Sequence, residues 1–298
     1  MPTPDGALPA AATWGRLNTF LAVYDARSVG AAATNLHVTP PAVSAAVTAL
    51  ERGLGVPLFT KAGRGITPTD AGHTFAGYVR TMIGLLSEAA AAVCDAETGR
   101  LRLGAVATAG EYVLPGLTAS FLTAHPRIEL SLEVLPRDDL FARAQHHELD
   151  VVIAGRPPAG SGLLTRARRP NRLLAVRAPD TPSDPRAARW LLRGHGSGTR
   201  ETALGLLQAL DARPATLTLG TSGAVVAAAR HGLGTTLVHE DAVRDDLTRG
   251  LLVPTPVPGT PLDRPWHLCT PPDPTPAALL FLTHVTDRVT AGSASFTA

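Results

Sequence analysis

Residues 17–70 read LNTFLAVYDARSVGAAATNLHVTPPAVSAAVTALERGLGVPLFTKAGRGITPTD, and this stretch decides the fold of the first part of the chain. It opens with one apolar helix face, made of Leu17, Phe20, Leu21 and Tyr24. A short Ala-rich helix, a Thr-Pro-Pro helix start and a Gly-bounded basic loop follow in that order. This order predicts a winged helix-turn-helix, a fold that places one helix in the major groove of DNA.

The helix that starts at Thr39 is expected to read the DNA. Thr39 can cap it, and two prolines suit its first turn, where a missing N–H costs little. Its apolar side chains recur at intervals of four, three and four residues: Val43, Val47, Leu50 and Leu54. Because these point inward, the candidate DNA contacts are Thr39, Pro40, Pro41, Ser44, Ala45 and Thr48.

The segment after this helix predicts a wing. Ser28 can cap the second helix, and Gly53 and Gly55 are expected to end the third. Residues 56–60 and 65–68 then read as two short strands, with Lys61 and Arg64 at the tip to reach a phosphate or the minor groove. Residues 16–68 carry five cations against two carboxylates, which predicts a small phosphate-binding face. A three-helix domain that binds protein is the alternative interpretation.

A second long helix is predicted directly after the wing. Its apolar residues are spaced four, three, four, three and four apart: Phe75, Val79, Met82, Leu86, Ala89 and Val93. This period is nearer 3.5 than 3.6 and favours pairing of helices between two chains. The alternative is an amphipathic helix packed on its own domain.

From about residue 100 the chain alternates short apolar runs with helices, an α/β pattern. Strands are expected at residues 101–107, 128–135 and 150–154, and a single final helix at 275–291. Ligands bind such sheets beyond the carboxyl ends of the strands, near helix N-termini. The candidate effector contacts are Thr108, Ala109, Gly110, Ser197, Gly198, Thr199, Arg200, Thr221 and Ser222. Ordinary helix capping by these hydroxyl residues is the alternative.

Composition limits the other functions. The 298 residues carry a net charge of +2 and two cysteines, which provide neither a disulfide framework nor a metal motif. No P-loop, GxGxxG or GxSxG pattern is present, so we expect no enzyme, cofactor or metal. No apolar run is long enough for a membrane span, and residues 1–15 read as a disordered leader, so we expect a cytoplasmic protein.

The N-terminal run resembles the DNA-binding domain of LysR-type transcriptional regulators. The matching pieces are F-x-A-V, S-x-x-x-A-A-x-x-L-H-V-T, P-A-V-S, L-E-x-x-L-G-V-P-L-F and T-x-T-D-A-G. The family commonly has Gln and Arg where this chain has Pro40 and Ala45. Gln and Arg make bidentate contacts to bases, so we expect fewer direct base hydrogen bonds and more reading of DNA shape.

The C-terminal part resembles the effector domain of the same regulators, with two α/β subdomains akin to periplasmic binding proteins. The matching patterns are G-x-L-x-x-G-A-x-x-T-x-G (99–110) and E-L-D-V-V-I (148–153). The run W-L-L-R-x-x-G-S-G-T-R-E (190–201) looks like a subgroup linked to sulfur or carbon assimilation, whose effectors are often anions. The resemblance implies dimers or tetramers held by the linker helix.

These patterns predict a DNA-binding domain (16–73), a linker helix (74–98) and an effector domain (99–298). Subdomain I is expected at about 100–168 and 266–298, and subdomain II at about 169–265. The function expected is regulation of transcription, with a small anionic effector acting on an oligomer bound to double-stranded DNA. The alternatives are a solute-binding protein or enzyme with an added helix-turn-helix, and a DNA-bending protein without an effector.

Overall fold

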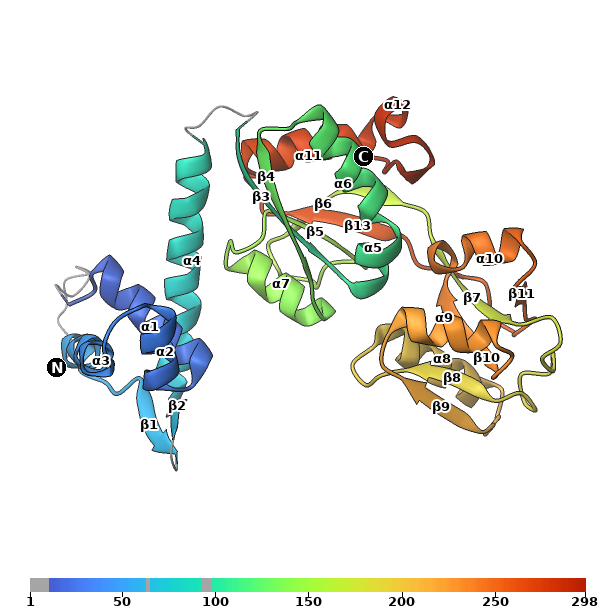
Figure 1. Cartoon of the computed structure of the whole chain (residues 1–298), viewed down its shortest axis with the longest axis horizontal. Helices are drawn as coiled ribbons and strands as arrows, with labels where there is room; N and C mark the ends of the chain where they lie inside the picture. Colours follow the sequence, from blue (N-terminus) through green and yellow to red (C-terminus); the bar gives the residue numbers. More distant parts are fainter. Residues whose placement is uncertain (1–10, 63–64, 93–97) are drawn as a thin grey trace. The chain divides into compact units, whose positions relative to one another are not determined.

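The computed structural model describes residues 11–62, 65–92 and 98–298 (Figure 1). They form two compact units. The first comprises the residues up to Ser87 with His146–Glu148, and the second comprises Glu88–Gln145 and Leu149–Ala298. Each unit buries its own hydrophobic core. No helix within the described residues is both long and apolar enough to cross a membrane.

The first unit is a helix-turn-helix with a two-stranded wing, as predicted. Its elements are α1 (Trp14–Ala26), α2 (Val29–Asn35), α3 (Pro40–Leu54), β1 (Phe59–Ala62), β2 (Gly65–Pro68) and α4 (Asp70–Ala92). Ser28 caps α2 by accepting a hydrogen bond from the N–H of Ala31. The strands β1 and β2 are antiparallel, with Phe59 opposite Pro68.

One predicted helix boundary in this unit is wrong, and the predicted end of α3 at Gly55 is confirmed. Trp14 and Gly15 belong to α1 and not to a disordered leader, while residues 1–10 of that leader lie outside the described residues. The helix α3 continues through Gly53 and ends at Gly55, whose φ of 73° is the left-handed conformation that glycine adopts at helix ends.

The first wing strand was predicted to begin at Val56, but β1 begins at Phe59. The reason is the side chain of Glu51, whose Oε1 accepts hydrogen bonds from the N–H groups of Leu58 (2.8 Å) and Phe59 (3.1 Å). These two donors are therefore held by α3, which keeps the preceding residues in a turn.

The helix α4 packs closely on the turn before the wing. Thr69 caps α4 by accepting from the N–H of Gly72. A Cβ atom at Gly72 would lie 2.1 Å from the carbonyl oxygen of Leu58, so only glycine fits this contact. The start of α4 is thus part of the DNA-binding fold.

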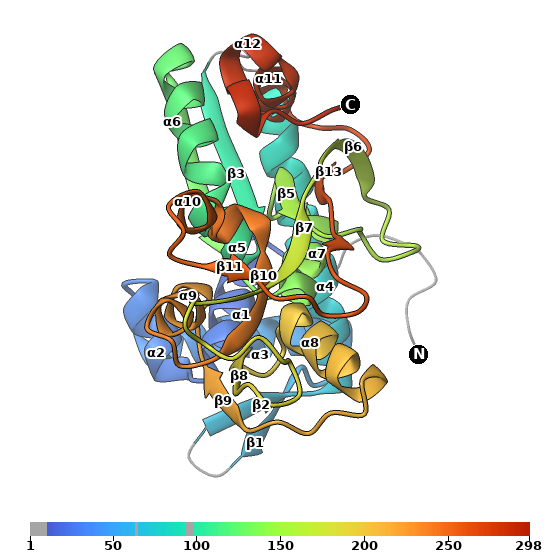
Figure 2. The same ribbon diagram turned by 90° about the vertical axis from the view of Figure 1, so that its right-hand side faces the viewer.

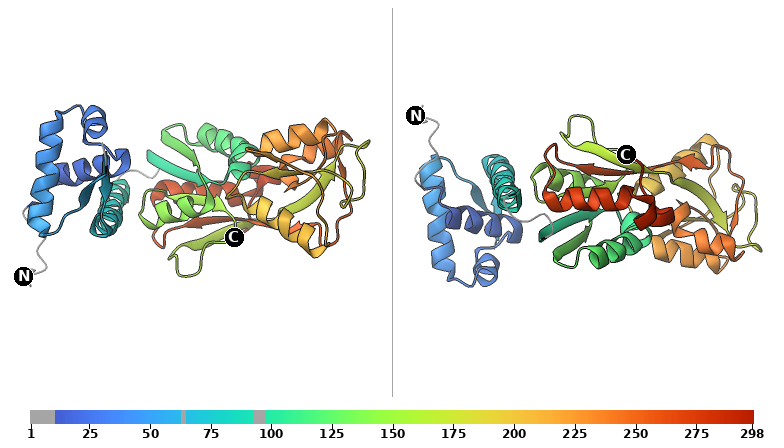
Figure 3. Two further views of the ribbon diagram at one scale, coloured as in Figure 1. Left: turned by 90° about the horizontal axis from the view of Figure 1, so that it is seen from below. Right: turned by 90° about the horizontal axis from the view of Figure 1, so that it is seen from above.

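Subdomain I of the second unit is a five-stranded sheet of order β4-β3-β5-β13-β6. The strands are β3 (Gly99–Ala105), β4 (Ile128–Val134), β5 (Val151–Ala154), β6 (Leu164–Arg169) and β13 (Trp266–Thr270). One face is covered by α5 (Ala107–Tyr112), α6 (Leu114–Ala124) and α11 (Pro276–Thr286), and the other by α7 (Arg137–Gln145) (Figure 3).

Subdomain II is a second sheet of order β11-β7-β10-β8-β9, with β12 also paired to β7. Its strands are β7 (Arg172–Arg177), β8 (Trp190–Arg193), β9 (Thr216–Leu219), β10 (Thr235–His239), β11 (Val253–Pro254) and β12 (Leu262–Asp263). The helix α8 (Gly198–Ala209) covers one face, and α9 (Ser222–Arg230) covers the other (Figure 2). After β10 come the short helices η1 (Glu240–Ala242) and α10 (Arg244–Thr248).

Two connections join the subdomains, at residues 170–171 between β6 and β7 and at residues 264–265 between β12 and β13. The strands β6, β11 and β12 and the helices α5 and α10 were not predicted. The strand expected at 101–107 stops at Ala105, where α5 follows. The predicted final helix is broken at Asp287, whose extended backbone and carboxylate cap α12 (Arg288–Ala291).

Candidate functional site

The outward face of α3 is where the sequence placed it. Val43, Val47 and Leu50 are buried, whereas Thr39, Pro40, Pro41, Ser44 and Ala45 are exposed and Thr48 is half-buried. Thr39 occupies the N-cap position, but its side chain makes no capping hydrogen bond, contrary to expectation. Its hydroxyl, with those of Ser44 and Thr48, supplies the polar groups of a face that Pro40 and Ala45 otherwise leave apolar.

Two cations of the same unit are exposed. Lys61 is exposed near the end of β1, while Arg64 lies outside the described residues. Arg27, one of the five cations within residues 16–68, is exposed at the end of α1 with a φ of 52° and stacks on Tyr24 at 4.8 Å. A planar guanidinium held over a ring loses less freedom when it meets a phosphate than a free side chain does.

The predicted seam between two chains is wrong over its first half. Val79 is buried, and Phe75 and Met82 are half-buried, in the same core as Phe20 of α1. The rings of Phe20 and Phe75 meet edge to face at 5.1 Å. The interpretation as a helix packed on its own domain is therefore right for these three residues.

A neighbouring stripe of α4 is exposed instead. Tyr78, Leu85 and Leu86 expose 73%, 47% and 51% of their surface, and Ala89 is exposed as well. Val93 lies outside the described residues. Spacings of seven and eight residues place Tyr78, Leu85 and Leu86 on one side of the helix. Of the predicted seam, Leu86 and Ala89 remain available to a partner.

The first effector segment contributes one side chain to the contact between the two subdomains of the effector part. Thr108 is buried, and its Oγ1 lies 3.1 Å from Oγ of Ser222 in the other subdomain. Ala109 belongs to the core of subdomain I. A Cβ at Gly110 would lie 2.7 Å from Cγ2 of Val134, so this glycine serves packing.

In the other two predicted effector segments, some residues cap or open a helix and others lie at the contact between the subdomains. Thr221 caps α9 by accepting from the N–H of Ala224, so the capping interpretation holds for it. Ser222, one residue later, contacts Thr108 of subdomain I. Ser197 is the N-cap of α8 without a side-chain capping bond, and Gly198 and Thr199 open the helix. Nη1 of Arg200 donates to the carbonyl oxygen of Arg193 (2.9 Å), which ties this guanidinium to the end of β8.

Arg193 is the cation at this contact between the subdomains, and it was not among the residues predicted from the sequence. Its Nη1 donates to Oγ of Ser222, and its Nε is a buried donor without a hydrogen-bond partner. Burial lowers the pKa of Arg193, opposed by the charges of Glu111 and Tyr112. Its position as the last residue of the run WLLR was the available signal, since residues ending parallel strands face the ligand edge.

Tyr112 lies at the same contact between the subdomains. A Cβ at Gly223 would be 3.9 Å from the Tyr112 hydroxyl. Burial and the nearby carboxylate of Glu111 raise the pKa of Tyr112, so it remains a neutral hydroxyl near neutral pH. The two most evident surface pockets, each about 270 Å³, lie elsewhere in subdomain II, against β7 and against α8.

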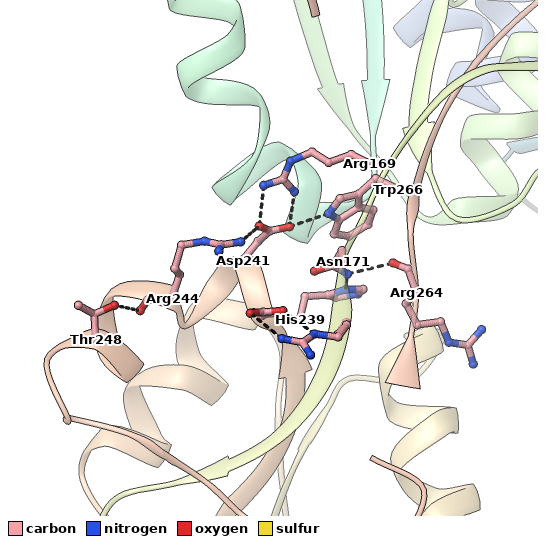
Figure 4. A network of polar contacts seen from close by, with 10 residues as sticks. Arg169, Asn171, His239, Asp241, Arg244, Thr248, Arg264 and Trp266 are labelled. Atoms are coloured by element: carbon pink, nitrogen blue, oxygen red, sulfur yellow. Dashed lines mark hydrogen bonds and ion pairs between the residues drawn. The ribbon is translucent and has the colours of Figure 1, made fainter. Parts of the chain in front are cut away.

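A second polar network lies where the chain crosses between the subdomains (Figure 4). Asp241 in η1 accepts hydrogen bonds from Arg169, Arg244 and Trp266. Burial alone would raise the pKa of Asp241, but these donors hold it below its ordinary value. Beside it, burial lowers the pKa of His239 to about 4, with the charge of Asp241 opposing and that of Arg193 adding to the effect.

Comparison with known proteins identifies both parts of the chain. Residues 14–73 match the family model described as bacterial regulatory helix-turn-helix protein, lysR family. Residues 95–290 match the model described as LysR substrate binding domain. The transcriptional regulator CbbR of Rhodospirillum rubrum is 32% identical over 265 residues, covering 85% of this chain and 88% of CbbR.

Two solved structures share the fold. Full-length CbnR, a structure complexed with its target DNA, has a TM-score of 0.64 at 24% identity and covers 94% of this chain and 100% of its own. The regulatory domain of Synechocystis CcmR, in complex with 2-PG, has a TM-score of 0.54 at 25% identity. That comparison covers 62% of this chain and 95% of the CcmR domain.

The low pKa of His239 predicts a pH dependence of stability. Because the unfolded chain binds a proton near the ordinary pKa of 6.5 and the folded chain only near about 4, the unfolded state gains stability as the pH falls between these values. The free energy of unfolding should drop by roughly 3 kcal/mol over that range. His239→Gln should flatten this part of a plot of melting temperature against pH. The exposed-site control His231→Gln should keep the full slope, and equal slopes in both variants would contradict the assignment.

Proposed function

This chain belongs to the LysR family of transcriptional regulators, and on that premise we propose that it senses a small anion at Thr108, Arg193 and Ser222. It is a DNA-binding regulator of transcription, with an N-terminal helix-turn-helix domain and a C-terminal effector-binding domain. We propose residues 14–73 together with the first half of α4 as the DNA-binding domain, the second half of α4 as the linker, and residues 99–298 as the effector domain. We also propose that it acts in the cytoplasm, where its DNA target lies.

One observation carries the choice of an anion. Arg193 is a half-buried cation that forms no ion pair with a carboxylate among the described residues, its Nε–H is unpaired, and the hydroxyls of Ser222 and Thr108 extend from it toward subdomain I. A buried guanidinium is costly without an acceptor, and charge-assisted hydrogen bonds to an oxyanion are strong. Hydroxyl groups can turn their protons toward the same oxyanion. The complex of CcmR with 2-PG supports a small ligand in this type of domain.

The effector proposal is tested by thermal shift with phosphate, sulfate, acetate and 2-PG. A ligand at about a hundred times its Kd should stabilise the protein by roughly 2.7 kcal/mol. Arg193→Gln should abolish the shift, and Thr108→Val should weaken it. Arg213→Gln, which changes an exposed arginine of the same subdomain, is the matched control and should keep the shift. A full shift in Arg193→Gln, or no shift of the parent protein with any probe, would refute this site.

We propose that α3 and the wing contact double-stranded DNA through Thr39, Pro40, Pro41, Ser44, Ala45, Thr48, Lys61 and Arg64, with Arg27 as a phosphate contact. The exposed hydroxyl of Ser44 is the polar group nearest the centre of the outward face. Base contacts give specificity, while phosphate contacts give affinity for any sequence. The two kinds of residue should therefore respond differently to substitution.

The DNA proposal is tested on a duplex selected by this protein from a random pool, beside an unselected duplex. Ser44→Ala should weaken binding to the selected duplex by about three- to tenfold and leave the other unchanged, since a single hydrogen bond is worth about 1 kcal/mol. Arg27→Ala should weaken both alike and lower the salt slope by about 1. Equal losses on both duplexes for Ser44→Ala would remove Ser44 from base reading.

We propose that two chains pair through the exposed stripe of α4 formed by Tyr78, Leu85 and Leu86. Adjacent apolar side chains on a long helix are the kind of surface that a second helix covers. Leu86→Glu should raise the dimer dissociation constant at least tenfold in sedimentation equilibrium. Leu279→Glu on α11, where the leucine is 48% exposed, is the control and should not change it. Unchanged association of Leu86→Glu would exclude this stripe.

A further inference from the structure

The two connections between the subdomains converge on one carboxylate. Arg169, at the end of β6, donates to Asp241 through two bonds, Nη1 to Oδ2 (2.7 Å) and Nη2 to Oδ1 (2.9 Å). Trp266, at the start of β13, donates from Nε1 to Oδ2 (2.8 Å). Arg244, in the same subdomain as Asp241, donates to Oδ1 (2.9 Å). The last residue of β6 and the first residue of β13 thus both donate hydrogen bonds to one residue of subdomain II (Figure 4).

A neighbouring amide repeats this connection. Nδ2 of Asn171, in the first crossing, contacts Nδ1 of His239 (2.6 Å) and donates to the carbonyl oxygen of Arg264 in the second crossing (3.0 Å). The N–H of Arg264 donates back to the carbonyl oxygen of Asn171 (2.8 Å). The ring of His239 stacks on that of Trp266 at 4.5 Å. The end of β10 is therefore hydrogen-bonded to the first crossing and stacked on Trp266, which follows the second.

Burial makes the carboxylate contact hard to open. The side chains of Asp241 and Arg169 are only 4% and 10% exposed. Breaking a buried ion pair leaves two charges without compensation, which is strongly unfavourable. Hinges bend where a few residues can change their backbone angles freely, and here three residues that flank the crossings, Arg169, Arg172 and Trp266, donate to carboxylates of η1.

The network adjoins the proposed effector site. The helix α5, which carries Thr108, packs against η1, which carries Asp241. The strand β10, which leads into η1, lies beside β8, which ends at Arg193. The contacts that join the subdomains are hydrogen bonds between side chains: Thr108 with Ser222, and Arg169 and Trp266 with Asp241. These hydrogen bonds stabilise the arrangement of the two subdomains.

We infer that Asp241 is a hinge clamp: it holds the two subdomains at a fixed angle through protein contacts alone. An effector at Thr108, Arg193 and Ser222 then binds at a junction whose angle the clamp already sets. This consequence for regulation rests on the proposed effector site. The clamp itself does not, because it is a property of the chain without added ligand.

The clamp is tested by measuring distances within the full-length protein. Spin labels are placed at Ala119→Cys on α6 and Ala209→Cys on α8, both exposed positions, after Cys94→Ser. Cys269 is buried, and burial raises its thiol pKa to about 11, so it stays unlabelled. Dilution with unlabelled protein restricts the signal to pairs within one chain. The parent protein, without added ligand, should give one narrow distance distribution.

Asp241→Asn should at least double the width of that distribution. Arg169→Lys keeps the positive charge but loses the two-bond fork, so it should also broaden the distribution and serves if Asp241→Asn does not fold. Asp245→Asn, an exposed carboxylate in α10, is the matched control and should leave the width unchanged. A broad distribution in the parent protein, or parental width in the folded variants, would overturn the clamp. Either result is independent of whether any anion binds at Arg193.

Discussion

The buried carboxylate of Asp241 is the contact on which the arrangement of the effector domain depends. A buried charge is stable only when donors surround it, and here the donors come from both connections between the subdomains and from α10. The hydrogen bonds to this one carboxylate therefore position the end of β6 and the start of β13 against η1. The contact of Thr108 with Ser222 lies beside this network, because α5 packs against η1.

Two arginines near the junction of the subdomains have different partners. Arg169 is neutralised by Asp241 through two hydrogen bonds, and its role is structural. Arg193 donates to a serine hydroxyl and forms no ion pair with a carboxylate among the described residues. Both arginines have a buried Nε without a partner, so the difference in role rests on the carboxylate that Arg169 has and Arg193 lacks. Arg200, the cation that the sequence favoured, is engaged with the carbonyl oxygen of Arg193 instead.

In the N-terminal unit, a few contacts join the long helix α4 to the helix-turn-helix. Phe75 and Val79 of α4 complete the core around Phe20, and Gly72 allows α4 to touch the carbonyl of Leu58. The first half of α4 is thus a fourth helix of the DNA-binding unit. What remains for contact with another chain is the stripe of Tyr78, Leu85 and Leu86.

Features that depend on neighbouring residues could be predicted from the amino-acid sequence alone. The capping of α2 by Ser28, the inward face of α3 and the alternation of strands and helices follow from local spacing and local hydrogen bonds. The winged helix-turn-helix and the α/β effector domain could be predicted for this reason. The short strands and helices that were missed, such as β6 and α5, lack a long periodic pattern.

The residues of the sites come together only in the folded chain. Thr108 and Ser222 are 114 residues apart in the chain, and Arg169 and Asp241 are 72 apart. Local spacing cannot predict such pairs, because the two partners lie on elements that are distant in the sequence, such as α5 and α9 or β6 and η1. For the same reason the heptad spacing of α4 could not show that Val79 packs in the core of its own domain. The spacing predicts an apolar helix face, but it does not predict which surface covers that face.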